Sequence, residues 1–297
     1  MPLHVRQLPA NISQIISDEG VPKEQSLFNP SIAGNFLYVR LNIHAPTSEQ
    51  NHILIIDIAK GSQHVIPSPD KLLAKTCNLY QGLEDLRICL YKNRLWFTAT
   101  STHSTNHMKS EMVLGYFDTK LTCVEHLAFI DVGTRPSKNV CPFVVKDKLM
   151  LVDFYTSSVF ELCENPESDG KKEDIRIRKV LSLKFGAGIP QNTYRGSTSP
   201  VHLRGNTWGC VVHDIIFCDK QVLVTQLSYL NHWVEFDIST GVISFVSTPF
   251  FIAHWGVEFI SGISYSEDKR SVDLYFSIQD NKALVAKTNI DLLRVGK

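Results

Sequence analysis

The sequence predicts an all-β fold, a five-bladed β-propeller with four-stranded antiparallel blades around a central tunnel, as a single domain over residues 1–297. Three observations predict it: five hairpin signals recur along the chain, they lie roughly 55 to 63 residues apart, and helical periodicity is scarce. This spacing is typical of a blade built from four short strands and their loops. A stack of β-meanders closed as a sandwich is the alternative, but near-constant spacing of five hairpins disfavours it.

Each hairpin signal combines an apolar run, a tight polar turn and a second run rich in aromatic and β-branched residues. The five signals lie in residues 29–40, 85–98, 140–153, 199–211 and 261–276. Their turns are predicted at Gly34-Asn35, Lys92-Asn93, Lys146-Asp147, Arg204-Gly205 and Glu267-Asp268. We expect each unit to begin with the strand that lines the tunnel.

The remaining strands of the blades are predicted between the hairpins. They lie at residues 53–58, 113–117, 159–163, 180–184, 222–227, 242–246 and 283–289. Residues 70–75 are expected to form one turn of helix, and the polar segment 165–174 is expected to be an exposed loop.

Charge and cysteine content argue against several classes of function. Lys plus Arg and Asp plus Glu both number 30, and no basic block could neutralise a run of phosphates, so we expect no nucleic-acid partner. No segment has the apolar character of a signal peptide or a membrane span, which predicts a soluble, cytoplasmic protein. The seven cysteines include no Cys-x-x-Cys pair, so buried free thiols are expected.

We expect no metal or other cofactor. His103 and His107 have a spacing that binds metal on a helix, but their neighbours are typical of a loop. The glycines of residues 186–190 lack the lysine and the following helix of a phosphate loop. No Gly-x-Ser-x-Gly motif is present, so serine hydrolysis has no support.

Polar residues at the starts of the five units are expected to converge in the tunnel, because the first strand of each blade lines it. Both signs of charge occur among them, as suits a sugar with its ring of hydroxyls. These residues are Asn29, Glu84, Asp85, Arg87, Lys138, Asn139, Arg195, Ser197, Thr198, Ser199, Glu258 and Ser261.

Short motifs in these units resemble glycoside hydrolase family 130. The motifs are Phe28-Asn-Pro30, Tyr38-Val-Arg40, Gly82-Leu-Glu-Asp-Leu-Arg87, Trp96-Phe-Thr98, Tyr194-Arg-Gly-Ser-Thr-Ser-Pro200, Val212-His-Asp214, Glu258-Phe-Ile-Ser-Gly262 and Tyr275-Phe-Ser-Ile-Gln-Asp280. They extend over nearly the full chain, and Glu84-Asp-Leu-Arg87 is the most specific. That family contains β-mannoside phosphorylases and β-mannosidases, and related five-bladed proteins are β-1,2-mannosyltransferases.

The resemblance implies a role for each matching residue. Asp85 matches the general acid, which passes its proton toward the glycosidic oxygen through a sugar hydroxyl. His213 and Lys138 match residues that hold the attacking phosphate. The residues expected to bind the substrate are Asn29, Arg40, Arg87, Arg195 and Asp280.

This allocation also makes chemical sense. A phosphorylase or a transferase brings its own nucleophile or activated donor, so one carboxylic acid suffices, whereas a glycosidase needs a second carboxylate to activate water. Glu258 and Asp153 are both candidates for that second carboxylate. Inorganic phosphate, a sugar phosphate or a nucleotide sugar would require cations. The candidates are Arg87, Arg195, Lys138 and His213.

Two departures from the family pattern keep the reaction open. Leu86 stands where the family has proline, which changes the stiffness of the turn that presents Asp85. Arg135 is the only arginine just before Lys138 that could complete a phosphate site. A transferase or glycosidase is therefore at least as well supported as a phosphorylase.

Structural roles compete with these functional ones. Asp85 and Arg87 could form an ion pair between blades, and His213 could be a hydrogen-bonded core histidine. The tryptophans are expected to pack between blades, although the polar neighbours of Trp233 also allow it to face a ligand. A non-catalytic glycan-binding or scaffold propeller is the alternative from another class of function.

Overall fold

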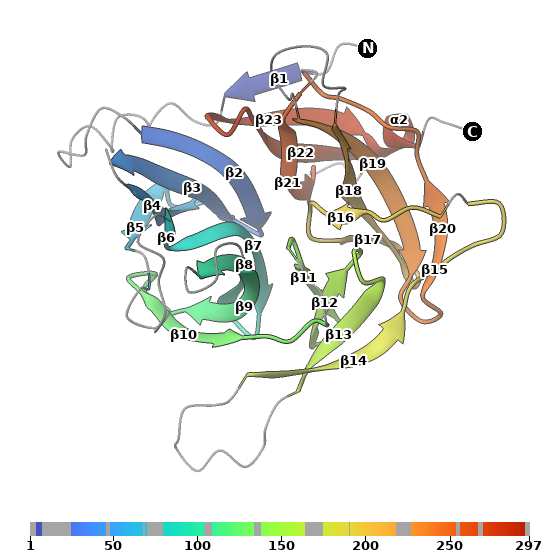
Figure 1. Cartoon of the computed structure of the whole chain (residues 1–297), viewed down its shortest axis with the longest axis horizontal. Helices are drawn as coiled ribbons and strands as arrows, with labels where there is room; N and C mark the ends of the chain where they lie inside the picture. Colours follow the sequence, from blue (N-terminus) through green and yellow to red (C-terminus); the bar gives the residue numbers. More distant parts are fainter. Residues whose placement is uncertain are drawn as a thin grey trace.

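Five β-sheets are arranged in a ring around a central axis (Figure 1). The computed structural model describes residues 4–7, 25–45, 48–67, 69, 80–103, 109–133, 138–163, 175–189, 191–217, 227–253, 256–266 and 270–294. We number the sheets as blades 1 to 5 in chain order, beginning with the sheet that starts at Gln25. The five-bladed propeller predicted from the repeat is confirmed, and the sandwich alternative is wrong.

The first three blades each run from the centre of the ring outward through four antiparallel strands. Blade 1 contains β2 (Gln25–Ala33), β3 (Phe36–Ala45), β4 (Ser48–Asp57) and β5 (Ser62–Ile66), with β6 (Tyr80–Gln81) parallel to β4. Blade 2 contains β7 (Leu83–Tyr91), β8 (Arg94–His103), β9 (Lys109–Phe117) and β10 (Val124–Phe129). Blade 3 contains β11 (Cys141–Val145), β12 (Lys148–Asp153), β13 (Ser158–Cys163) and β14 (Arg176–Ser182).

The last two blades depart from this plan at their edges. In blade 4, β16 (Arg195–Gly196) and β17 (Val201–Arg204) both pair with β18 (Thr207–Phe217), followed by β19 (Leu227–Asp237), β20 (Val242–Val246) and the parallel strand β15 (Lys184–Phe185). Blade 5 contains β21 (Glu258–Tyr265), β22 (Ser271–Ile278) and β23 (Lys282–Asn289), then the short helix α2 (Ile290–Leu293). Strand β1 (His4–Gln7) pairs antiparallel with β23, so the start of the chain completes the last blade and closes the ring.

The hydrophobic core is divided into five clusters, one between each pair of neighbouring blades. Successive side chains of a strand point to opposite faces of its sheet, so one strand supplies two clusters. In β4, Ile53 and Ile55 pack against blade 2, whereas Leu54 and Ile56 pack against blade 5. This double burial explains why the middle strands are continuously apolar rather than alternating.

Most of the predicted turns and strands are confirmed. Lys92, Asn93, Lys146 and Asp147 all have positive φ angles, as the two central residues of a type I′ hairpin require. The turn predicted at Arg204-Gly205 lies one position later, because Arg204 still belongs to β17. The strand predicted at residues 180–184 is divided at Leu183 between β14 and β15.

Several expectations fall outside the described residues. They are the helical turn at 70–75, the loop at 165–174, the turn at Glu267-Asp268 and most of the strand at 222–227. Within the described segments, Cys89, Cys123, Cys141, Cys163 and Cys210 are free thiols, as predicted. The expectation that they are buried holds for Cys89, Cys141 and Cys210, whereas Cys163 is half-buried and Cys123 is exposed. No helix in the described segments is long and apolar enough to cross a membrane.

A ring of buried hydrogen bonds joins the blades near the axis. The Ser31 hydroxyl of blade 1 accepts from the backbone N–H of Ile88 at 3.1 Å. The Thr98 hydroxyl of blade 2 donates to the carbonyl of Val140 at 2.6 Å. The Ser261 hydroxyl of blade 5 donates to the carbonyl of Pro30 at 2.8 Å. These bonds satisfy backbone groups that are buried between neighbouring blades.

Arg87 is the most extensive of these links. Its side chain is fully buried, and its Nε donates to the carbonyl of Ser197 in blade 4. Its Nη1 donates to the carbonyl of Asp85 at 2.7 Å, and its Nη2 donates to Asn139 Oδ1 at 3.4 Å. The guanidinium also stacks on the ring of Phe259, 4.9 Å from its centroid. One side chain of blade 2 therefore contacts the inner segments of blades 3, 4 and 5.

We expect Gly196→Ala to destabilise the ring. A Cβ at this position would overlap the carbonyl oxygen of Asn139 and lie 2.9 Å from Cys141 Sγ, so blades 3 and 4 would have to separate. Such overpacking costs about 3 kcal/mol. Gly34→Ala is the control, because no atom lies within 4 Å of its added Cβ and only the positive φ angle costs energy, about 1 kcal/mol. Urea unfolding measures both; equal losses would contradict the close approach.

We expect Arg87→Met to cost about 3 kcal/mol or more of unfolding free energy, because it leaves buried carbonyl groups without a donor. The control is Arg178→Met, which removes an exposed arginine paired with Glu161 and should cost less than about 1 kcal/mol. Chemical denaturation of both variants provides the measurement. If the two unfolding midpoints coincide, Arg87 does not link the blades.

Candidate functional site

Three residues near the axis share an uncommon backbone conformation. Asn29 in β2, Asp85 in β7 and Asn139 just before β11 have φ angles of 51°, 53° and 65°. Asparagine and aspartate adopt this left-handed region more readily than other side chains. In β2 and β7 it coincides with a β-bulge, where the pairing register shifts between Phe28 and Ser31 and between Glu84 and Arg87. Bulges redirect side chains, and here they bring Asn29 and Asp85 together.

The Asp85 carboxylate is held from one side. Its Oδ1 accepts from Asn29 Nδ2 at 2.5 Å and lies 3.4 Å from Arg40 Nη1. The amide of Asn29 is oriented in turn by the hydroxyl of Ser277 in blade 5, which donates to Asn29 Oδ1 at 2.8 Å. The Asp85 side chain keeps 17% of its surface exposed. Both contacts use Oδ1, so within the described part of the chain Oδ2 is left for a ligand.

Arg40 is the fixed cation beside this carboxylate. Its Nε donates to Asn51 Oδ1 at 2.8 Å, and its Nη2 lies 3.3 Å from Glu84 Oε1. Burial acts to lower the pKa of Arg40, but the carboxylates of Glu84, Asp85 and Asp280 outweigh it, so the pKa is raised. Arg40 is therefore permanently charged, and its guanidinium is shared between adjacent carboxylates.

Asp280 lies on the exposed turn between β22 and β23, also with a positive φ angle of 48°. Its charge acts on Arg40 and on Tyr229. The structure thus brings Asn29, Arg40, Asp85 and Asp280 into one neighbourhood, although they come from blades 1, 2 and 5.

A second group lies on the blade 4 side. Arg195 in β16 pairs across the sheet with His213 in β18, and the His213 ring packs against Tyr229 and Phe259 at centroid distances of 4.9 and 5.2 Å. His213 Nδ1 lies 2.8 Å from the hydroxyl of Ser197. Burial, followed by the charges of Arg195 and Arg87, lowers the pKa of His213 to about 3. His213 is therefore a neutral imidazole at neutral pH, and the expectation that it adds a cation is wrong.

Tyr229 lies close to these charged residues, and sequence reasoning did not single it out. Burial, followed by the charges of Asp280 and Asp85, raises its pKa to about 12, whereas the charge of Arg195 acts in the opposite direction. The hydroxyl is thus protonated at neutral pH and lies within the field of both carboxylates and the arginine. Tyr229 is in β19, which pairs with the β18 segment that carries His213, and this pairing is not visible in the sequence.

Two other residues predicted to bind ligand are more enclosed by the protein than the sequence suggested. Lys138 is half-buried and lies directly before Asn139, on the segment that leads into β11. Arg87, expected to contact substrate, is a buried clamp whose donors face protein acceptors. The ion pair considered between Asp85 and Arg87 does not form. Arg87 instead donates to the backbone carbonyl of Asp85, and the Asp85 carboxylate pairs with Arg40.

The two candidates for a second carboxylate are fully buried. Glu258 accepts the backbone N–H groups of Ile252 and Ala253 at 2.7 and 2.8 Å, one on each oxygen. Asp153 accepts from the N–H of Tyr155 at 3.0 Å and the hydroxyl of Thr156 at 2.8 Å. Both carboxylates stabilise local loops, and neither has the exposure that a base for water would need.

Tryptophans pack between the blades, as most were expected to. Trp233 is fully buried and donates its indole N–H to Glu235 at 2.9 Å, so the alternative in which it faces a ligand is wrong. Trp96 and Trp208 are buried in neighbouring clusters, and Trp255 lies outside the described residues. Among the described residues, no group of three or more His, Cys, Asp and Glu is placed to hold a metal ion. His107 lies outside the described residues.

No protein-family model matches this chain, and no curated protein matches it.

Solved structures, in contrast, share its architecture. A mannose phosphorylase from Leishmania mexicana, in complex with phosphate ion, superposes with a TM-score of 0.58 at 13% identity, covering 97% of this chain and 95% of that one. A GDP-Man-dependent mannosyltransferase from the same organism has a TM-score of 0.54 at 12% identity, covering 96% and 95%. β-1,2-Mannobiose phosphorylase from Listeria innocua has a TM-score of 0.54 at 11% identity, covering 91% of each chain. The fold of this chain therefore resembles the five-bladed propeller of mannoside phosphorylases and mannosyltransferases, including glycoside hydrolase family 130.

Proposed function

We propose that this chain is a carbohydrate-active enzyme that transfers or cleaves a β-linked, mannosyl-type glycosyl group, with Asp85 as the general acid. The observation that carries the proposal is the Asp85 carboxylate, which is oriented through Oδ1 by Asn29 and Arg40 and still partly exposed. The full-length likeness to phosphorylases and a transferase supports the same class of chemistry.

Asp85 can serve the departing oxygen of the glycosidic bond. In its protonated form it gives a proton toward that oxygen, directly or through a sugar hydroxyl, as the C1–O bond breaks. The negative charge left on the carboxylate is then stabilised by the guanidinium of Arg40 and the amide of Asn29. Asp280 and Tyr229, whose electrostatic interaction extends to Asp85, supply an acceptor and a donor for sugar hydroxyls.

An anionic nucleophile or donor fits the site better than water does. Arg195 belongs to blade 4 and Lys138 leads into blade 3, whereas Asn29 and Arg40, which anchor Asp85, belong to blade 1. The neutral His213 adds hydrogen bonding without charge. The carboxylates of Glu258 and Asp153 already accept hydrogen bonds from backbone N–H groups of local loops, so neither is an evident base for activating water. We therefore favour phosphate, a sugar phosphate or a nucleotide sugar as the second reactant over hydrolysis.

Asp85→Asn should lower turnover by about 10²- to 10⁴-fold while leaving carbohydrate binding nearly unchanged, because the amide cannot transfer the proton but keeps the size of the side chain and an oxygen that accepts from Asn29. The protein is incubated in parallel with mannose 1-phosphate, GDP-mannose and β-mannosides, and products are followed by mass spectrometry. Glu125→Gln, on the surface next to Arg94, is the matched control and should keep wild-type turnover. Equal binding by both proteins with no turnover in either would instead support a non-catalytic glycan-binding propeller.

The neutral state of His213 should be visible in the pH dependence of stability. Its folded pKa of about 3 lies below the ordinary value of 6.5, so the unfolded chain binds the extra proton between these values. Stability from this residue is therefore complete above pH 6.5 and falls by about 1.4 kcal/mol per pH unit as the pH drops toward 3.

Urea unfolding between pH 7 and 5 should show this slope in the wild type and a flatter one in His213→Gln. Tyr229→Phe is the control, because it alters the neighbouring ring but keeps the imidazole and should keep the slope. Identical slopes in wild type and His213→Gln would mean that His213 is charged in the folded protein.

A further inference from the structure

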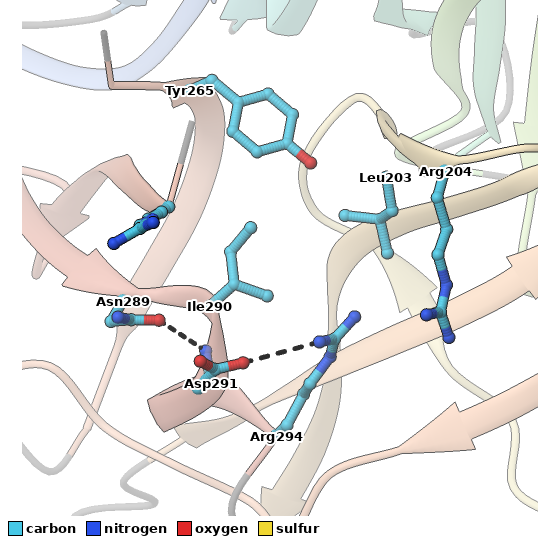
Figure 2. A pocket seen from close by; sticks show the side chains of 8 residues that line it. Leu203, Arg204, Tyr265, Asn289, Ile290, Asp291 and Arg294 are labelled. Atoms are coloured by element: carbon cyan, nitrogen blue, oxygen red, sulfur yellow. Dashed lines mark hydrogen bonds and ion pairs between the residues drawn. The ribbon is translucent and has the colours of Figure 1, made fainter. Parts of the chain in front are cut away.

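A pocket of about 500 Å³ lies between blades 4 and 5, away from the tunnel site (Figure 2). Its walls come from the end of β17, the end of β21, the residue before β22 and the segment from β23 into α2. Phe259, near the start of β21, touches Arg87 and His213, whereas Tyr265 ends that strand six positions later. At the rise of a β-strand this separates the pocket from the tunnel site by about 20 Å.

Three arginines line this pocket, namely Arg204, Arg270 and Arg294. The whole chain has no net charge, with 30 basic and 30 acidic residues, so a cluster of three guanidinium groups is a local excess. Among the described residues, two carboxylates contact Arg294, namely Asp291, in the wall, and Glu235, behind it.

Arg294 is held in a fixed orientation. Its Nε donates to Glu235 Oε1 at 2.5 Å, and its Nη1 lies 3.5 Å from Asp291 Oδ1. Glu235 is itself buried and accepts the indole N–H of Trp233 at 2.9 Å. The hydrogen bond to Glu235 raises the pKa of Arg294, against the effect of burial. A guanidinium already held in place by two carboxylates loses little further freedom when its remaining N–H groups bind a ligand.

Arg204 faces the same space from the other side of the pocket, as Figure 2 shows. Within the described residues it makes no ion pair, and its side chain is exposed at the end of β17. The wall also carries Leu203, Ile290 and the ring of Tyr265, whose hydroxyl donates to the carbonyl of His202 at 2.9 Å. Cationic and apolar surfaces therefore meet in one concavity of ligand size.

We propose that this pocket is a second ligand site, which binds a small organic phosphomonoester. A phosphomonoester has three terminal oxygens and nearly two negative charges, so it can accept from two guanidinium groups at once, whereas a carboxylate is satisfied by one. The apolar wall of Leu203, Ile290 and Tyr265 would cover the organic part of the ligand. The site is independent of the proposed reaction, since none of the residues argued to act there lines it.

Arginine modification read residue by residue can test this site without any assay of turnover. The full chain is treated with 4-hydroxyphenylglyoxal in the presence of mannose 6-phosphate, inorganic phosphate or mannose at matched ionic strength, and each arginine is quantified by peptide mass spectrometry. At a probe concentration about ten times its Kd, mannose 6-phosphate should slow modification of Arg204 and Arg294 about tenfold. Arg178, exposed on β14, should be unaffected, and mannose alone should protect none of them.

Arg204→Gln should weaken binding of mannose 6-phosphate about tenfold or more, with Arg178→Gln as the control. Arg204 is exposed at a turn, so its replacement should not disturb folding, which thermal unfolding checks. Equal protection by sodium chloride, or protection confined to Arg195 in the tunnel, would overturn the pocket proposal. Protection confined to Arg195 would leave the proposed reaction in place. Conversely, unchanged turnover in Asp85→Asn would contradict the proposed reaction and would not affect the pocket proposal.

Discussion

The buried guanidinium of Arg87 is the interaction on which the centre of this propeller depends. Its donors end on the carbonyls of Ser197 and Asp85 and on the side chain of Asn139, so one charge joins the inner segments of three blades. Burying a charge is costly unless it is fully hydrogen-bonded, and here inward-facing carbonyls and the face of Phe259 provide that environment. Because one acceptor is the carbonyl of Asp85 itself, the same clamp holds the backbone from which the candidate acid projects.

Presentation of Asp85 depends on its left-handed backbone as well as on this clamp. Proline at position 86 would have restricted the turn covalently, but this chain has leucine there. Leu86 is fully buried in the cluster between blades 1 and 2, so packing supplies the rigidity that a ring would otherwise give. The bulge, the buried Leu86 and the Arg87 clamp together account for how an aspartate with a φ angle of 53° is kept in a strained conformation beside a cation.

The repeat was readable in the sequence because hairpin chemistry is local. Lys92-Asn93 and Lys146-Asp147 identify their turns without any tertiary information. The convergence of Asn29 and Asp85 was also predictable, because inner strands meet at the axis, whereas Arg40 lies in β3 and was expected only from the family resemblance. The charge of His213, the burial of Arg87 and the part played by Tyr229 were not. Each depends on neighbours from other blades, such as Phe259 and Asp280, and neither periodicity nor spacing reports which side chains remain exposed after five sheets pack together.

The two concentrations of charge in this neutral chain have different physical characters. Near the axis, Arg40 is shared by carboxylates and largely removed from water, so its field is strong and weakly screened, as suits a place where charge changes during a reaction. Between blades 4 and 5, Arg204 is exposed at the end of its strand, where salt screens its field and only direct contact gives affinity. These two charged regions are separated because the two ends of a strand lie at opposite faces of the ring. The proposed reactive site and the proposed pocket can therefore lie in one propeller with little electrostatic coupling between the two.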